Sequence, residues 1–218
     1  MTGLVLRSLP DQLTELLRER ILAGVAEPDR PIRQDALAAE LGVSKIPLRE
    51  AMTRLEQEGL LRSEANRGYF VSSLSAEEAR EIYGLRRRLE PEMASLAARG
   101  ATADEQAEAT QALKALDKAT RAHGDGVGAL NRAFHLALVR PARQPLTLGI
   151  VERLHILSER YVRKHLEPLG RDRRANAEHR ALLDAWLARD RRTVTRLLAA
   201  HIDATQDDLE RQLAAHPE

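Results

Sequence analysis

The feature that most constrains this chain is a stretch from Leu37 to Gly59, which reads LAAELGVSKIPLREAMTRLEQEG. Gly42 stands where a first helix must end, because a helix C-terminus favours a residue that is free to adopt positive φ. Ser44 can offer its side-chain oxygen to the unpaired N–H groups of a new helix, and Pro47 is tolerated in the first turn of that helix. We therefore predict two short helices joined by a tight turn, the second beginning at Lys45.

The second helix has two different faces. Its apolar residues form an inward stripe, while Lys45, Arg49 and Thr53 follow along another side at i, i+4 and i+8. This layout is a helix-turn-helix, in which the second helix enters the major groove of DNA. The net charge is only +1, and residues 1–74 hold ten Lys and Arg against eleven Asp and Glu. DNA binding therefore depends on a few placed cations rather than on bulk charge.

A small β-hairpin is predicted directly after the second helix. Its strands are residues 60–63 and 69–72, and the loop between them contains Asn66, Arg67 and Gly68. Arg67 beside a glycine forms a small cationic tip that suits a phosphate or the minor groove. A hairpin in this place is the wing of a winged helix-turn-helix domain.

These motifs resemble those of a known family. The runs LGVSKIPLREAMTRLEQEGLL and NRGYFV resemble the winged helix-turn-helix signature of the GntR superfamily of bacterial regulators. The residues that we predict to contact DNA are Arg33, Ser44, Lys45, Ile46, Arg49, Asn66, Arg67 and Gly68. Asp35 stands where relatives often carry a basic residue, and it would repel a phosphate, so either Arg33 substitutes for that contact or the contact is absent. Lys45 replaces the more frequent arginine, and a lysine cannot form the two parallel hydrogen bonds by which an arginine recognises guanine.

Composition favours helices for the rest of the chain. Aromatic residues make up 3% and hydrophobic residues 43% of the 218 residues, so the core must be aliphatic. The absence of cysteine excludes disulfides and thiolate metal sites. The N-terminus lacks a signal-peptide core and no apolar run has the length of a membrane span, so we expect a cytoplasmic protein with no membrane partner.

The domain boundary is predicted at the polar linker Ser72–Ser75, where Ser75 and Glu78 have the spacing of a capping box. Residues 1–74 are expected to form the winged helix-turn-helix DNA-binding domain and residues 75–218 an all-helical effector-binding and dimerisation domain. Helices are predicted over residues 10–25, 34–41, 76–99, 103–122, 129–139, 146–166, 175–188 and 191–214, with a flexible joint at 123–128 and a loop at 167–173. The fold class is therefore mainly α, a winged helix-turn-helix followed by an antiparallel helical bundle.

Three histidines lie on the inward faces of three different predicted helices. His135, His179 and His201 each share a face with apolar residues three or four positions away. One inward histidine is usually a satisfied core residue. Three in one bundle suit a divalent transition metal such as zinc or nickel, because neutral imidazoles in a dry core are good ligands.

Arg86 interrupts the apolar stripe of the helix predicted over residues 76–99. Two explanations are open. The side chain can form an i, i+4 ion pair with Glu90 or extend its charge to the surface, or it can be a buried cation that binds a carboxylate ligand.

A second resemblance covers the predicted bundle. The segments YGLRRRLEPEMASLAA, FH, EHRALLDAWLARD and HI resemble the FCD ligand domain of the FadR-like GntR branch, so that the two resemblances span residues from about 10 to 212. The FCD resemblance implies a metal held by His135, His179, His201 and an aspartate, whose place Asn131 takes here. Because an amide lacks the negative charge, we expect a weaker or differently tuned metal site. The resemblance also implies a carboxylate effector at the open positions of the metal, clamped by Arg86.

The sequence thus predicts a transcriptional repressor that binds a palindromic double-stranded DNA operator as a homodimer and responds to a small carboxylate effector. A metal-dependent helical-bundle enzyme is one alternative. However, Glu152 to His155 supply only one Glu-x-x-His where a di-iron site needs two, and no hydrolase or phosphate-binding motif is present. We therefore do not expect an enzyme. A second alternative is a DNA-binding protein whose bundle only dimerises.

Overall fold

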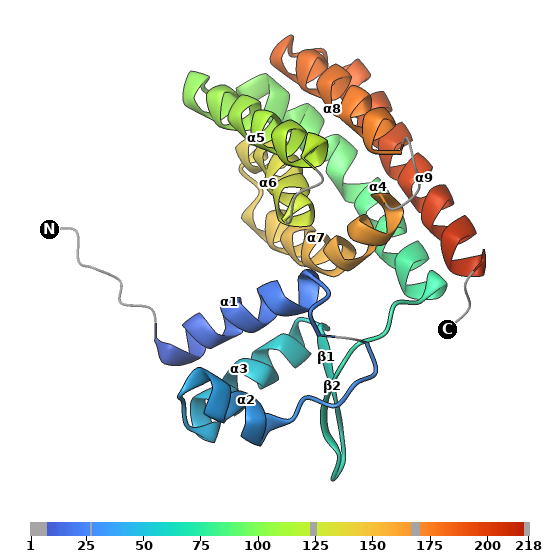
Figure 1. The fold of residues 1–218 in the computed structure, drawn as a ribbon. Coiled ribbons are helices and arrows are strands. Elements are labelled where there is room, and N and C mark those ends of the chain that lie inside the picture. The colour runs from blue at the N-terminus through green and yellow to red at the C-terminus, as the bar shows by residue number, and fades with distance from the viewer. Residues whose placement is uncertain (1–7, 27, 123–125, 167–170, 216–218) are drawn as a thin grey trace, which may run out of the picture. The chain divides into compact units, whose positions relative to one another are not determined.

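The computed structural model describes residues 8–26, 28–122, 126–166 and 171–215 (Figure 1). The chain divides into two compact units between Leu74 and Ser75. Unit 1 is the part before this division, and unit 2 is the part after it. None of the described helices is both long enough and apolar enough to cross a membrane.

Unit 1 contains three helices and a two-stranded sheet. These elements are α1 (Leu9–Leu22), α2 (Gln34–Leu41), α3 (Lys45–Gln57), β1 (Leu61–Glu64) and β2 (Gly68–Val71). The strands pair antiparallel, with Leu61 opposite Val71, and each lies one residue away from its predicted position. Pro31 adds an isolated bridge to Phe70, so the chain before α2 extends the sheet. Helix α1 starts earlier than predicted because Ser8 and Asp11 form a capping box.

The turn between α2 and α3 has the predicted backbone but not the predicted cap. Gly42 has φ +65°, the left-handed conformation that ends α2, and its N–H donates to the carbonyls of Ala38 and Ala39. Ser44 is extended and α3 begins at Lys45, but the Ser44 side chain makes no cap hydrogen bond, so that part of the prediction is wrong. The Ser44 hydroxyl is therefore not used by the backbone of α3.

Unit 2 is entirely helical in its described residues. The elements are α4 (Ala76–Gly100), α5 (Ala103–Arg121), α6 (Val127–Val139), the 3-10 turn η1 (Arg140–Ala142), α7 (Pro145–Leu166), α8 (Arg171–Leu187) and α9 (Arg191–Ala215). Helices α4 and α9 run side by side along the bundle, and α5 packs on α6 (Figure 1). Trp186 on α8 is fully buried, and its Nε1 donates to the Leu138 carbonyl at 3.1 Å.

Two predicted loops in unit 2 are shorter than expected. Helix α6 begins at Val127, inside the joint predicted at 123–128, whose residues 123–125 lie outside the described part. Helix α8 begins at Arg171, four residues earlier than predicted, and residues 167–170 of the predicted loop also lie outside the described part. Helix α6 thus includes Val127 and Gly128 of the predicted joint, and α8 includes the charged residues 171–174.

The start of α4 is tied to α7. The Ser75 side chain accepts from the Glu78 N–H at 3.0 Å, as predicted. The Glu78 carboxylate does not return to Ser75 but accepts from Tyr161 and Arg160 of α7, so the predicted capping box is only half formed. The Tyr161 hydroxyl also accepts from the Ser75 N–H at 3.1 Å. The first residue after the boundary is thereby held by a buried tyrosine.

Candidate DNA-binding face and metal centre

The exposed side of α3 forms an open groove in unit 1. It is lined by Lys45, Ile46, Arg49, Glu50, Thr53, Arg54 and Gln57. The opposite side of the helix, with Leu48, Met52 and Leu55, is fully buried. The helix therefore presents the predicted cationic side outward, while its apolar stripe holds it in the unit.

Most cations near this face are paired with acids of the same unit. Lys45 forms an ion pair with Asp35 across the turn, and Arg67 forms one with Glu64. By contrast, Arg33 and Arg49 make no ion pair with any residue that the structure describes. DNA phosphates would have to compete with Asp35 and Glu64 for two of the predicted cations.

The wing places its cation on an aromatic support. Asn66 and Gly68 have φ of +61° and +89°, which turn the chain sharply between β1 and β2. The Arg67 guanidinium lies 5.1 Å from the centre of the Phe70 ring, and 68% of its side chain is exposed. Arg67 is thus pre-positioned at the tip by a cation–π contact, and a phosphate that displaced Glu64 would reach its exposed charge.

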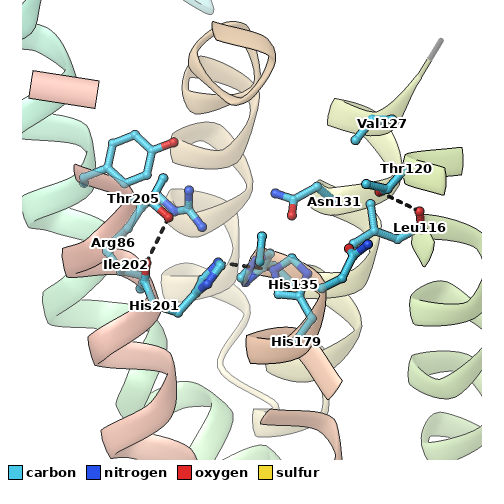
Figure 2. A pocket seen from close by; sticks show the side chains of 13 residues that line it. Arg86, Leu116, Thr120, Val127, Asn131, His135, His179, His201, Ile202 and Thr205 are labelled. Carbon is cyan, nitrogen blue, oxygen red and sulfur yellow. Dashed lines mark hydrogen bonds between the residues drawn. The ribbon is translucent and has the colours of Figure 1, made fainter. Parts of the chain in front are cut away.

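The second candidate site is a histidine cluster inside unit 2. His135 comes from α6, His179 from α8 and His201 from α9, and Figure 2 shows the three side chains converging, with Arg86 and Asn131 on either side. Their ring centres lie 4.6 to 5.3 Å apart. One donor nitrogen from each ring lies within 4.8 Å of the others. These three predicted ligands therefore meet in space.

The nitrogens of this cluster have the properties of metal ligands. His135 is 1% exposed, and neither its Nδ1 nor its Nε2 has a hydrogen-bond partner among the described residues. Burial, together with the neighbouring His179 and His201, holds the pKa of His135 well below its ordinary value, so its imidazole is neutral. A neutral ring with a buried, unsatisfied lone pair fits a metal ion, which would remove the cost of the missing bond.

A carboxylate orients the third histidine. His201 Nδ1 lies 2.7 Å from a Glu178 carboxylate oxygen, while its Nε2 lies 3.2 Å from His179 Nε2. A carboxylate acceptor at Nδ1 favours the tautomer that turns the Nε2 lone pair toward the cluster, as in metal sites where a carboxylate orients the ligand. Glu178 is not among the predicted site residues, although it directly precedes His179 in the sequence.

A second donor set shares His135 with the first. Glu90, His135 and His155 are all buried and also bring three donor atoms within 4.8 Å of one another. In this set Glu90 is committed to Arg86, whose Nε donates to it at 2.6 Å. Burial opposes the ionisation of Glu90, but Arg86 and His155 lower its pKa to about 2. Because the Arg86 cation would repel a metal here, the set with His179 and His201 is the better metal site.

His155 was not among the predicted ligands, although a signal for it exists in the sequence. Val151 stands one helical turn before His155, and both are buried. The criterion that selected the other three histidines would therefore have selected His155 as well.

Of the two explanations predicted for Arg86, the structure contains the i, i+4 ion pair with Glu90. Arg86 is 3% exposed and pairs with Glu90 as an i, i+4 partner, while its Nη1 donates to Ser158 Oγ at 3.2 Å. It also lines a cavity of about 30 Å³ together with Asn131, His135, His179 and His201. One water needs at least about 10–15 Å³. The cavity thus has room for an ion and one or two waters, and an organic acid would have to widen it.

Both units of the chain are similar to known protein families. Residues 9–71 match the family model "Bacterial regulatory proteins, gntR family", and residues 81–204 match the FCD domain. The repressor GlaR of Escherichia coli is 31% identical over 196 residues, which are 85% of this chain and 89% of GlaR. The uncharacterized regulator YdhC of Bacillus subtilis is 35% identical over 59% of this chain, and that match spans only 58% of YdhC.

Solved structures give the same result for the whole chain. The structure of E. coli McbR/YncC superposes with a TM-score of 0.82 at 25% identity, covering 95% of this chain and 99% of McbR. Both units of the fold are therefore shared with a solved regulator.

Proposed function

The chain belongs to the gntR family of bacterial regulatory proteins with an FCD domain, and we propose that it is a cytoplasmic repressor of transcription. A small organic acid bound in unit 2 controls its affinity for the operator. The observation that carries the proposal is the buried histidine cluster, in which neither nitrogen of His135 has a hydrogen-bond partner among the residues that the structure describes. A transcriptional regulator that needed unit 2 only for dimerisation would gain nothing from such a costly group.

On the DNA side, the proposed contacts are the predicted ones. Arg33, Ser44, Lys45, Ile46 and Arg49 lie at the starts of α2 and α3 and on the exposed side of α3, and Asn66, Arg67 and Gly68 form the tip of the wing. With few cations, and two of them paired internally, one copy should bind weakly. A homodimer on a palindromic operator would double the contacts, which supports a paired assembly.

In unit 2, His135, His179 and His201 would hold a divalent metal such as zinc or nickel, with the Asn131 amide oxygen as a weaker fourth ligand in place of a carboxylate. Such a metal, when bound, supplies a Lewis acid that accepts a carboxylate oxygen. Arg86 would receive the other end of the acid. Because Glu90 already neutralises Arg86, the acid would have to share or displace this internal carboxylate.

The matches to known proteins contradict the alternative that the chain is a metal-dependent enzyme. The matched gntR family and the relatives GlaR, YdhC and McbR are regulators by name, so the chain is a transcriptional regulator and not a metal-dependent enzyme.

The test is a gel-shift titration of the purified protein on its own upstream DNA. We expect specific binding at physiological salt, metal uptake by the wild type but not by His135→Ala, and weaker operator binding when one member of a panel of small carboxylic acids is added. Equal affinity for random DNA would overturn DNA-sequence recognition. Specific binding with no response to any acid, with or without zinc or nickel, would instead assign unit 2 to dimerisation alone.

A further inference from the structure

Ile46 is an apolar side chain in an unusual place. It is 73% exposed, more than any other large hydrophobic side chain that the structure describes in unit 1. It stands in the first turn of α3 and lines the open groove together with Lys45 and Arg49. In helix-turn-helix proteins, the residues near the N-terminus of the second helix are the ones that reach base edges.

The chemistry of this side chain limits what it can read. Isoleucine neither donates nor accepts a hydrogen bond, so it cannot use the donor and acceptor pattern of the major groove. The apolar group on that edge of DNA is the C5-methyl of thymine. Ile46 is β-branched and therefore stiff at χ1, which lowers the entropy lost when it is pinned against a base.

The side chains next to Ile46 are suited to other contacts than the thymine methyl group. Lys45 is drawn to Asp35 across the turn, and the Thr53 hydroxyl donates to the Arg49 carbonyl at 3.0 Å. Arg49 makes no ion pair in the described part of the chain and can bind a phosphate or a guanine beside the thymine.

We propose that Ile46 makes this protein select a thymine in each half of its operator, by packing against the thymine C5-methyl in the major groove. The inference rests on the proposed DNA-binding function and adds the identity of one base pair to it. Burying one methyl group is worth about 0.8 kcal/mol, which corresponds to about fourfold in affinity per half-site.

The experiment begins with selection of binding sites from random DNA by the full-length wild type and by Ile46→Ala. Val25→Ala serves as the matched control, since Val25 is another aliphatic side chain of unit 1 and is 72% exposed. The thymine whose preference the Ile46→Ala variant loses is then replaced by deoxyuridine, which lacks only the methyl group. Affinities of all three proteins are measured for both DNAs at one salt concentration.

We expect deoxyuridine to weaken wild-type binding about fourfold in one half-site and about sixteenfold in both, with no effect on Ile46→Ala and the full effect on Val25→Ala. The wild type could select a defined site while Ile46→Ala keeps the same thymine preference and the same sensitivity to deoxyuridine. Ile46 would then not contact the methyl group, and this proposal would be overturned while the proposed DNA-binding function stands. If the wild type selects no site at all, the proposed function fails with it.

Discussion

The α3 face and the histidine cluster use charge in opposite ways. On α3 the ionic groups are exposed: the side chains of Lys45 and Asp35 are 62% and 78% accessible. Beside the cluster they are buried, since the side chains of Arg86 and Glu90 are 3% and 0% accessible. An exposed pair contributes about 0–1 kcal/mol, whereas a buried charge without its partner costs several times more. A substitution in the exposed Lys45–Asp35 pair should therefore alter DNA binding with little effect on stability, whereas a substitution in the buried Arg86–Glu90 pair should destabilise the fold.

The largest effect that tests this contrast is expected from Glu90→Ala. It leaves Arg86 buried without its carboxylate, which should lower the free energy of unfolding of unit 2 by about 3–5 kcal/mol. Trp186 is the single tryptophan of the chain and is fully buried in unit 2, so its fluorescence during urea unfolding reports on this unit. Asp203→Ala is the control, because it breaks the exposed pair with Arg87 and should cost at most about 1 kcal/mol. Equal losses in the two variants would contradict the contrast.

The next effect concerns metal affinity. Glu178→Gln removes the carboxylate that orients His201, and loss of such an outer partner typically weakens metal binding about 10- to 100-fold. Isothermal titration calorimetry with zinc or nickel measures the change, and Asp184→Asn, on the exposed side of the same helix, is the control. Unchanged affinity in Glu178→Gln would mean that His201 is not a ligand or is oriented without the carboxylate.

A smaller effect, opposite in sign, is expected at α3. Asp35→Asn frees Lys45 and removes a negative charge near the phosphates, so operator affinity should rise about two- to fivefold at low salt. Glu19→Gln, which makes the same charge change on an exposed position of α1, controls for net charge. The gain should shrink as salt rises, because exposed charges are screened. Weaker binding of Asp35→Asn would show that the ion pair positions Lys45 for DNA.

The smallest effect is a pH dependence at the start of α1. Hydrogen bonds from Ser8, and the contact with Arg54, lower the pKa of Asp11 to about 2 from an ordinary value of 3.8. A lowered pKa means that the carboxylate stabilises the folded state above pH 3.8, and that this contribution disappears as the pH falls through 2. The protection of the α1 amides against hydrogen exchange, relative to their intrinsic rate at each pH, should therefore fall over this window in the wild type. The Asp11→Asn variant should lack that pH-dependent fall. Identical profiles would contradict the assignment.

Many local features could be predicted from the sequence. Gly42 marked the end of α2, and Lys45 the start of α3. The Arg86–Glu90 pair lies one turn apart on one helix, so its geometry depends only on the helical repeat. The sequence also indicated three inward histidines, because each shares a face with apolar neighbours. Two predicted cap contacts are absent: Ser44 makes no cap hydrogen bond, and the Glu78 carboxylate accepts from Tyr161 and Arg160 instead of from the Ser75 N–H.

What the sequence alone determined was therefore every relation set by the period of a helix or by one backbone turn, together with the family to which these motifs belong. The tertiary structure decided which side chains from different elements meet: Asp35 with Lys45, His155 with Glu90, Glu178 with His201, and the three histidines around one cavity. The physical reason is that such pairings depend on how helices pack and at which height along each helix they touch. No local propensity along the chain records that packing.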